Sequence, residues 1–201
     1  MPIIVNREEK RRAIALACKE VLLKHGIKEI TISKIAQTAG VGKGTIYEYF
    51  NNKEDIVFEI ISAFISEHEQ ELLMIRREQR PIREKVFRML CSMYQDAYHQ
   101  KQLMLYREYL AISLTSEVEE MQAFSQACRN RFLTLIRDLF TEGVKRGELR
   151  PEAVGLAEMF HSYGLGIVVE SHSTGQDPIA LIEQMVSHLF EVMENKEQVC
   201  E

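Results

Sequence analysis

The stretch TISKIAQTAGVGKGTIYEYFNNKED, residues 31–55, decides the fold of the first part of this chain. It predicts two short helices separated by a small-residue turn at residues 39–41, with the second helix beginning near Gly42. Helices this short bury too little apolar surface to form for stability alone. Two of them meeting at a glycine-containing turn are typical of a helix-turn-helix, which places the end of one helix in a groove of DNA.

The rest of the sequence has a helical pattern as well. Apolar residues recur at spacings of three and four throughout, and no stretch alternates in the way of a β-strand. We therefore expect an all-α protein of about nine helices. The first helix should run from Asn6 to Gly26, and a long fourth helix from Asn52 to about Arg80. Further helices are expected at residues 82–99, 102–113, 116–146, 151–171 and 178–194.

Charge is distributed unevenly along the chain, although its net charge is only −5. Residues 1–53 contain ten Lys or Arg and five Asp or Glu, whereas the remaining residues contain fifteen and twenty-five. The basic end coincides with the expected helix-turn-helix, which favours contact with phosphates over a merely solvated face. A hydrophobic content of 46% is sufficient for a small head and a larger body with its own core.

Several classes of protein are not expected. No apolar run is long enough to span a membrane, and the first residues lack the apolar core of a signal peptide, so we expect a cytoplasmic protein without membrane contact. The cysteines form no CxxC pair, which argues against a disulfide framework and a zinc site. We expect no metal and no cofactor, and buried, reduced thiols at Cys18, Cys91, Cys128 and Cys200.

Eight residues of the opening stretch are candidates for contact with DNA: Thr31, Gly42, Lys43, Gly44, Thr45, Tyr47, Tyr49 and Lys53. The helix start at Thr31, the two phenols and the ammonium group of Lys53 suit phosphates. Lys43 can reach a guanine edge and Thr45 a thymine methyl, while Gly44 permits close approach. Two interpretations stay open for Arg7, Lys10 and Arg11, namely an arm on the flanking DNA backbone and a solvated helix start.

The order of these residues resembles the DNA-binding signature of the TetR/AcrR family of bacterial transcriptional regulators. The matching positions are Thr31, Ile35-Ala36, Ala39-Gly40-Val41, Gly44-Thr45-Ile46-Tyr47, Tyr49-Phe50 and Lys53-Glu54. The resemblance departs at Gly42, where the family often has Ser. It implies a helix-turn-helix DNA-binding domain over residues 1–53 and a ligand-binding and dimerisation domain over residues 54–201. Such a homodimer would bind double-stranded DNA as a repressor and leave a palindromic operator when it binds a small-molecule effector.

By the same resemblance, the effector would bind between helices of the body. Residues on apolar stripes that also carry polar tips suit such a pocket. The candidates are Cys91, Tyr94, Tyr98, Tyr106, Phe124, Cys128, Met159 and His161. Stripes of this composition are also typical of an ordinary core, so that interpretation stays open beside the first.

The last two expected helices have unusually wide apolar surfaces. Residues 163–169, YGLGIVV, are apolar all round, which requires burial on more than one side. Burial of this kind at the end of the chain favours a partner subunit, and the alternative is a central core helix within the monomer. The candidates for dimer contacts are Tyr163, Ile167, Ile182, Met185, Leu189 and Met193.

Two other functions have weaker support. The spacings Glu158-x-x-His161 and Asp96-x-x-His99 resemble the metal-binding pairs of di-iron helical bundles, but no pair of glutamates completes them. A DNA-bound protein that acts on another protein would have the same helix-turn-helix. No nucleophile motif, glycine-rich phosphate loop or HExxH occurs, so we do not expect an enzyme.

Overall fold

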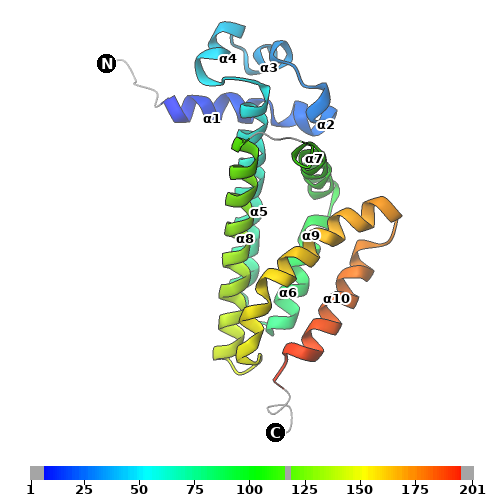
Figure 1. Cartoon of the computed structure of the whole chain (residues 1–201). Coiled ribbons are helices and arrows are strands. Elements are labelled where there is room, and N and C mark those ends of the chain that lie inside the picture. The colour runs from blue at the N-terminus through cyan, green and yellow to red at the C-terminus, as the bar shows by residue number, and fades with distance from the viewer. Residues whose placement is uncertain (1–6, 116–118, 196–201) are drawn as a thin grey trace. The chain divides into compact units, whose positions relative to one another are not determined.

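The computed structural model describes residues 7–115 and 119–195, which form ten α-helices and two short 3₁₀-helices (Figure 1). The helices are α1 Arg7–Ala17, α2 Lys19–Glu29, α3 Ile32–Ala39, α4 Lys43–Tyr49, α5 Lys53–Arg77, α6 Ile82–Cys91, η1 Ser92–Tyr94, α7 Ala97–Ser113, α8 Glu119–Lys145, η2 Pro151–Leu156, α9 Ala157–Thr174 and α10 Pro178–Met193. The expected all-α class is confirmed. Among the described residues, no helix combines the length and apolar character needed to cross a membrane.

The chain groups into two compact units. The first contains residues 1–68 and 101–117, and the second contains residues 69–100 and 118–201. Both α5 and α7 therefore contribute residues to each unit. Besides the expected DNA-binding helices, the first unit holds the start of α5 and most of α7. The functional boundary expected between residues 53 and 54 stays a prediction.

The first expected helix is divided into α1 and α2 at Cys18. The start expected at Asn6 lies outside the described residues. Cys18 is fully buried, and its thiol lies 3.7 Å from the carbonyl oxygen of Ile35 in α3. Burial raises the pKa of this thiol to about 11, so it stays protonated and behaves as a small core side chain. At Gly26 the backbone takes a φ of 77°, which favours glycine, before the chain reaches α3.

The helices α3 and α4 begin and end as the sequence predicts. Thr31 precedes α3, and its hydroxyl oxygen accepts a hydrogen bond from the Lys34 amide at 3.2 Å. Gly40 ends α3 with a φ of 66°, a left-handed conformation that glycine adopts without steric cost. Ile35 of α3 and Ile46 of α4 are both fully buried, so the two short helices are held by a shared core.

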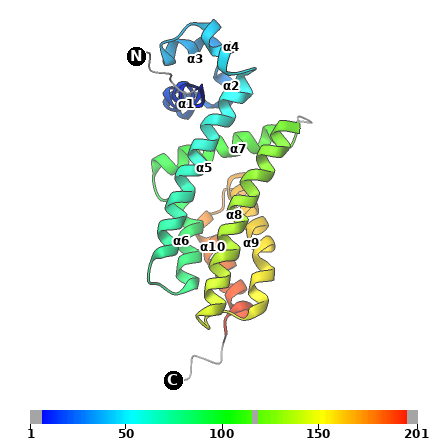
Figure 2. The ribbon, with the colours of Figure 1, turned by 90° about the vertical axis from the view of Figure 1, so that its left-hand side faces the viewer.

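The core of the second unit is built from α6, α8, α9 and α10. Figure 2 shows α8 running alongside α9. The rings of Phe140 in α8 and Phe160 in α9 meet edge to face with their centroids 5.5 Å apart. Phe190 of α10 and Ile82 of α6 belong to the same buried cluster. The four helices thus share one apolar core.

The structure corrects the expected helices 82–99 and 102–113. α6 ends at Cys91, a 3₁₀ turn follows, and α7 already begins at Ala97. The cause is Asp96, whose carboxylate accepts hydrogen bonds from the amides of Tyr98 and His99 at 2.8 and 3.0 Å. This carboxylate caps the start of α7, which periodicity alone does not reveal. The expected helix 151–171 likewise begins with a 3₁₀ segment, η2, and its α-helical part extends to Thr174.

Lys85 is a buried charge that ties three helices of the second unit together. Only 1% of Lys85 is exposed, and its ammonium group donates to the carbonyl oxygen of Arg76 at 2.7 Å and to Glu142 at 2.8 Å. Burial alone would raise the pKa of Glu142, but Lys85, with a contribution from Arg146, outweighs that effect and lowers it. The end of α5 is therefore fixed against α6 and α8.

We expect His99 to make stability depend on pH. Its Nε2 lies 3.0 Å from Glu71, and its Nδ1 lies 2.9 Å from Asp96. Burial alone would lower the pKa of His99, but these two carboxylates outweigh it and raise the pKa above its ordinary value. The stabilisation is therefore complete below the unfolded-state pKa of about 6.5 and is lost as the pH rises through the folded-state pKa.

Chemical denaturation between pH 6 and pH 8 measures this effect, and roughly this window brackets the ordinary His pKa. The free energy of unfolding should fall with rising pH in the unaltered protein and fall less in His99→Gln. His188→Gln, at an exposed position on α10, is the matched control. Equal pH dependence in all three proteins would contradict the assignment to His99.

Candidate nucleic-acid interface

α4 presents a polar surface opposite its buried side. Ile46 is fully buried and Phe50, which follows the helix, is 2% exposed. Tyr47 is 60% exposed, Lys43 is exposed, and Thr45 is half-buried. Because the buried residues fix the orientation of the helix, its start and outer face are left free for a partner such as DNA.

Neither of the two glycines at the start of α4 is required by the fold. Gly42 has a φ of −71°, and no protein atom lies within 4 Å of the position that a Cβ would take at Gly42 or Gly44. A side chain would therefore fit within the protein at both positions. The space is instead open to an external partner, which agrees with the close approach to DNA expected from the sequence.

Arg7 and Arg11 contact the C-terminal end of α4. Arg7 donates to the carbonyl oxygen of Glu48 at 2.9 Å, and Arg11 donates to that of Tyr49 at 2.8 Å. Neither of the two interpretations from the sequence foresaw these contacts, since both groups bind the protein's own backbone. Lys10 is half-buried.

Thr31, Tyr49 and Lys53 are placed less freely than the sequence suggests. The Thr31 hydroxyl caps α3, as described above, and Tyr49 is half-buried. The ammonium group of Lys53 donates to the carbonyl oxygen of Ile27 at 3.4 Å, a long hydrogen bond. A phosphate contact by Lys53 stays a prediction, and it would compete with this bond.

The same peptide segment is held from α7 by Glu108, which sequence reasoning missed. Its carboxylate accepts a hydrogen bond from the Ile27 amide at 2.7 Å. A Cβ at the neighbouring Gly26 would lie 2.5 Å from this carboxylate, so glycine is required here for space as well as for backbone conformation. Gly26 was the only hint in the sequence, because Glu108 follows Ile27 by 81 positions.

The candidate effector residues fall in different parts of the chain. Tyr106 belongs to the first unit and the other seven belong to the second. Cys91 and Tyr94 pack against the core of the second unit, while Tyr98 and Met159 are 39% and 49% exposed. The other four, Tyr106, Phe124, Cys128 and His161, are half-buried. Burial, and to a lesser extent Arg129, lower the pKa of His161, which favours its neutral form.

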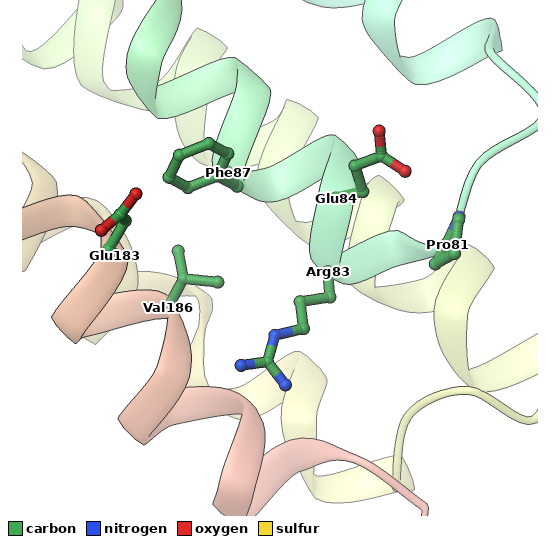
Figure 3. Close-up of a pocket in the computed structure, with 6 residues that line it drawn as sticks. All are labelled: Pro81, Arg83, Glu84, Phe87, Glu183 and Val186. Carbon is green, nitrogen blue, oxygen red and sulfur yellow. The ribbon is translucent and has the colours of Figure 1, made fainter. Parts of the chain in front are cut away.

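A groove of about 450 Å³ lies between α6 and α10, and none of the eight candidates lines it. Figure 3 shows Phe87 of α6 and Val186 of α10 on its two sides. The remaining lining residues are Pro81, Arg83, Glu84 and Glu183. Arg83 also lies 3.5 Å from the carboxylate of Glu194.

The candidate dimer residues separate into core and surface. Ile167, Ile182, Met185 and Met193 are at most 2% exposed in the core of the second unit, so their side chains are used within the monomer. For these four, the alternative of a monomer core describes the structure. Leu189 is half-buried and Tyr163 is 50% exposed. Other large apolar side chains exposed on α9 and α10 are Met159, Val169 and Val192.

The proposed metal-binding spacings are occupied by other interactions. The Glu158 carboxylate lies 2.7 Å from Arg137 and 3.6 Å from Arg129. His99 is held by carboxylates on both ring nitrogens, as described above. Within the described ranges, no cluster of three or more His, Cys, Asp or Glu side chains is arranged to hold a metal ion.

Comparison with known proteins gives consistent matches. A sequence model described as bacterial regulatory proteins of the tetR family matches residues 14–60. The uncharacterized HTH-type transcriptional regulator YhgD of Bacillus subtilis (strain 168) is 27% identical over 144 residues, which cover 71% of this chain and 73% of that protein. The fatty acid metabolism regulator protein of the same strain is 26% identical over 149 residues, covering 72% and 73%.

Solved structures share the fold over nearly the whole chain. A TetR-family regulator from Cytophaga hutchinsonii matches with a TM-score of 0.76 at 16% identity, covering 97% of this chain and 100% of that one. FadR from Bacillus subtilis, solved in complex with stearoyl-CoA, matches with a TM-score of 0.67 at 23% identity, covering 89% and 96%. The helix-turn-helix geometry, the family match and these relatives lead to one conclusion. The chain belongs to the TetR family of bacterial transcriptional regulators.

Proposed function

We propose that this protein is a transcriptional repressor that binds a specific DNA operator and is released from it by a small molecule. The observation that carries this proposal is the geometry of α4, a seven-residue helix whose apolar side is buried and whose polar side is exposed. Lys43 and Thr45 would read base edges, and Tyr47 would bind a phosphate. The family to which the chain belongs supports the same function.

The protein acts as a homodimer in this proposal. Two copies of α4 would then enter successive major grooves of a pseudo-palindromic site, about 34–36 Å apart. On α9, Met159, Tyr163 and Val169 recur at helical spacing and are each about half exposed. The neighbouring Gly166 has no protein atom within 4 Å of the position of a Cβ, so another helix could approach closely there. These residues support a subunit contact through the last two helices.

The effector would bind in the second unit, where seven of the eight candidate residues lie. A relative named as a fatty acid metabolism regulator, and a neighbour solved with stearoyl-CoA, make long-chain acyl-CoA thioesters the first molecules to test. The half-buried, mostly apolar candidates are compatible with an acyl chain. To cause release, the molecule must bind the DNA-free conformation more tightly than the DNA-bound one.

The contact between Glu108 and Ile27 gives the effector a route to the DNA-binding helices. α7 contributes residues to both units, and Glu108 holds the backbone at the end of α2. α5 is also one continuous helix from Lys53 to Arg77, and its end is fixed by Lys85. A shift of α7 or α5 on effector binding would change the spacing of the two recognition helices and end their match to the operator.

Selection of bound duplexes from a random pool tests the function directly. The unaltered protein should enrich a pseudo-palindrome, and stearoyl-CoA or another metabolite from a panel should reduce the affinity for it. A reporter gene behind the selected duplex should be expressed more strongly when the protein is absent. Enrichment of no sequence would contradict specific binding, and an unchanged reporter would contradict repression.

Gly44→Ala should separate DNA binding from stability. Because the protein leaves open space at this position, the methyl group should not reduce stability and should add up to about 0.5–1 kcal/mol through helix propensity. The same methyl group should weaken binding to the selected duplex by roughly tenfold, or about 1.4 kcal/mol. Thermal unfolding and titration of labelled DNA measure the two effects. Unweakened binding would show that no DNA atom lies close to Gly44.

Glu108→Ala should loosen the end of α2. Loss of a hydrogen bond to a charged acceptor should cost about 1–2 kcal/mol of stability and accelerate hydrogen exchange at the Ile27 amide. Glu108→Gln is the matched control, because it keeps an acceptor oxygen at the same reach and should retain most of the protection. Exchange at Ile27 that is identical in all three proteins would remove Glu108 from this role.

A further inference from the structure

The recognition helix α4 is too short to fix its own C-terminal end. It has seven residues, and after the Phe50 amide has bonded to the Ile46 carbonyl oxygen, the carbonyl groups of the last turn lack helical partners. The next amide, of Asn51, donates to the carboxylate of Asp55 at 2.9 Å and so does not continue the helix. The direction of α4 therefore depends on groups from elsewhere in the first unit.

Arg11 supplies one such group and connects three parts of the first unit. Its Nη1 donates to the Tyr49 carbonyl oxygen at 2.8 Å, and its Nε forms an ion pair with Glu59 of α5 at 3.1 Å. The guanidinium carbon also lies 4.6 Å from the centre of the buried Phe50 ring. A planar guanidinium can make all of these contacts at once, which a lysine ammonium cannot reproduce.

Arg7, one turn earlier on α1, holds the neighbouring carbonyl group. Its Nη2 donates to the Glu48 carbonyl oxygen at 2.9 Å. Two positive groups at the C-terminal end of a helix also interact favourably with its dipole. The two arginines thus bind consecutive carbonyl groups of α4 from one face of α1.

We propose that Arg7 and Arg11 are positioning residues for base readout, which hold α4 at the angle needed for its start to meet the bases. This inference rests on the proposed function, because it assumes that α4 reads DNA. It assigns the basic start of α1 to the protein's own backbone and not to DNA phosphates. The ion pair with Glu59 further directs Arg11 into the protein.

The two roles of these arginines predict different binding behaviour. A residue that orients α4 affects base contacts most, so its loss should weaken specific binding more than non-specific binding. A residue on a phosphate affects both kinds of binding equally. Its loss also reduces the slope of log K against log salt concentration by about 0.9.

The test compares Arg11→Gln, Arg7→Gln and Arg12→Gln in the full-length protein. Each variant removes one positive charge from α1, but Arg12 is exposed and no contact between it and α4 is described. Affinities are measured across a salt series for the duplex selected by the unaltered protein and for a shuffled duplex of the same composition. Thermal unfolding confirms that each variant is folded at the temperature of the measurement.

Arg11→Gln should bind the selected duplex at least about tenfold more weakly, the loss expected for one charged hydrogen bond. Its ratio of specific to non-specific affinity should fall, and its salt slope should match that of Arg12→Gln. Arg7→Gln should show the same pattern with a smaller loss, and it carries the test alone if Arg11→Gln does not fold. Arg11→Lys should restore little of the ratio, although it restores the charge.

Two results would overturn the inference while leaving the proposed function intact. One is an equal loss for both duplexes with a slope about 0.9 smaller than that of the control, which would place the arginines on phosphates. The other is an unchanged affinity ratio in both Arg7→Gln and Arg11→Gln. If the unaltered protein bound no duplex specifically, the proposed function itself would fail and this inference with it.

Discussion

The packing of Ile46 and Phe50 into the core of the first unit is the constraint on which the DNA-binding surface depends. A seven-residue helix makes too few hydrogen bonds to be stable in water, so α4 exists only because these two side chains are buried. Their burial also chooses which face is exposed, and so presents Lys43 and Tyr47 outward. The surface that would read DNA is a consequence of how the opposite surface packs.

The positive charge of the N-terminal residues is divided between two tasks. Arg7 and Arg11 bind carbonyl groups of α4, and Lys53 approaches the Ile27 carbonyl oxygen. A count of charges therefore overstates the number of groups ready to meet phosphates. The total charge still matters, because the long-range field that attracts DNA does not depend on which side chain finally touches it. Net charge indicates the kind of partner, whereas contacts depend on packing.

Features that depend on neighbouring residues were predictable from the sequence, and features that depend on distant contacts were not. The cap at Thr31 and the turn at Gly40 follow from local backbone chemistry, and the structure has both. The division at Cys18 depends on packing against α3, and the early start of α7 depends on a single carboxylate at Asp96. No local pattern could pair Glu108 with Ile27, because that bond forms only after the chain has folded.

The wide apolar surfaces of α9 and α10 show the same limit at the level of assembly. Hydrophobicity indicates how much surface a helix must bury but not against what. Within the monomer, Ile167, Ile182 and Met185 satisfy much of that requirement. What remains at the surface is a narrower row that includes Tyr163 and Val169, each about half exposed. A subunit contact would have to be built from this remainder and from the close approach that Gly166 allows, and so from shape as much as from hydrophobic area.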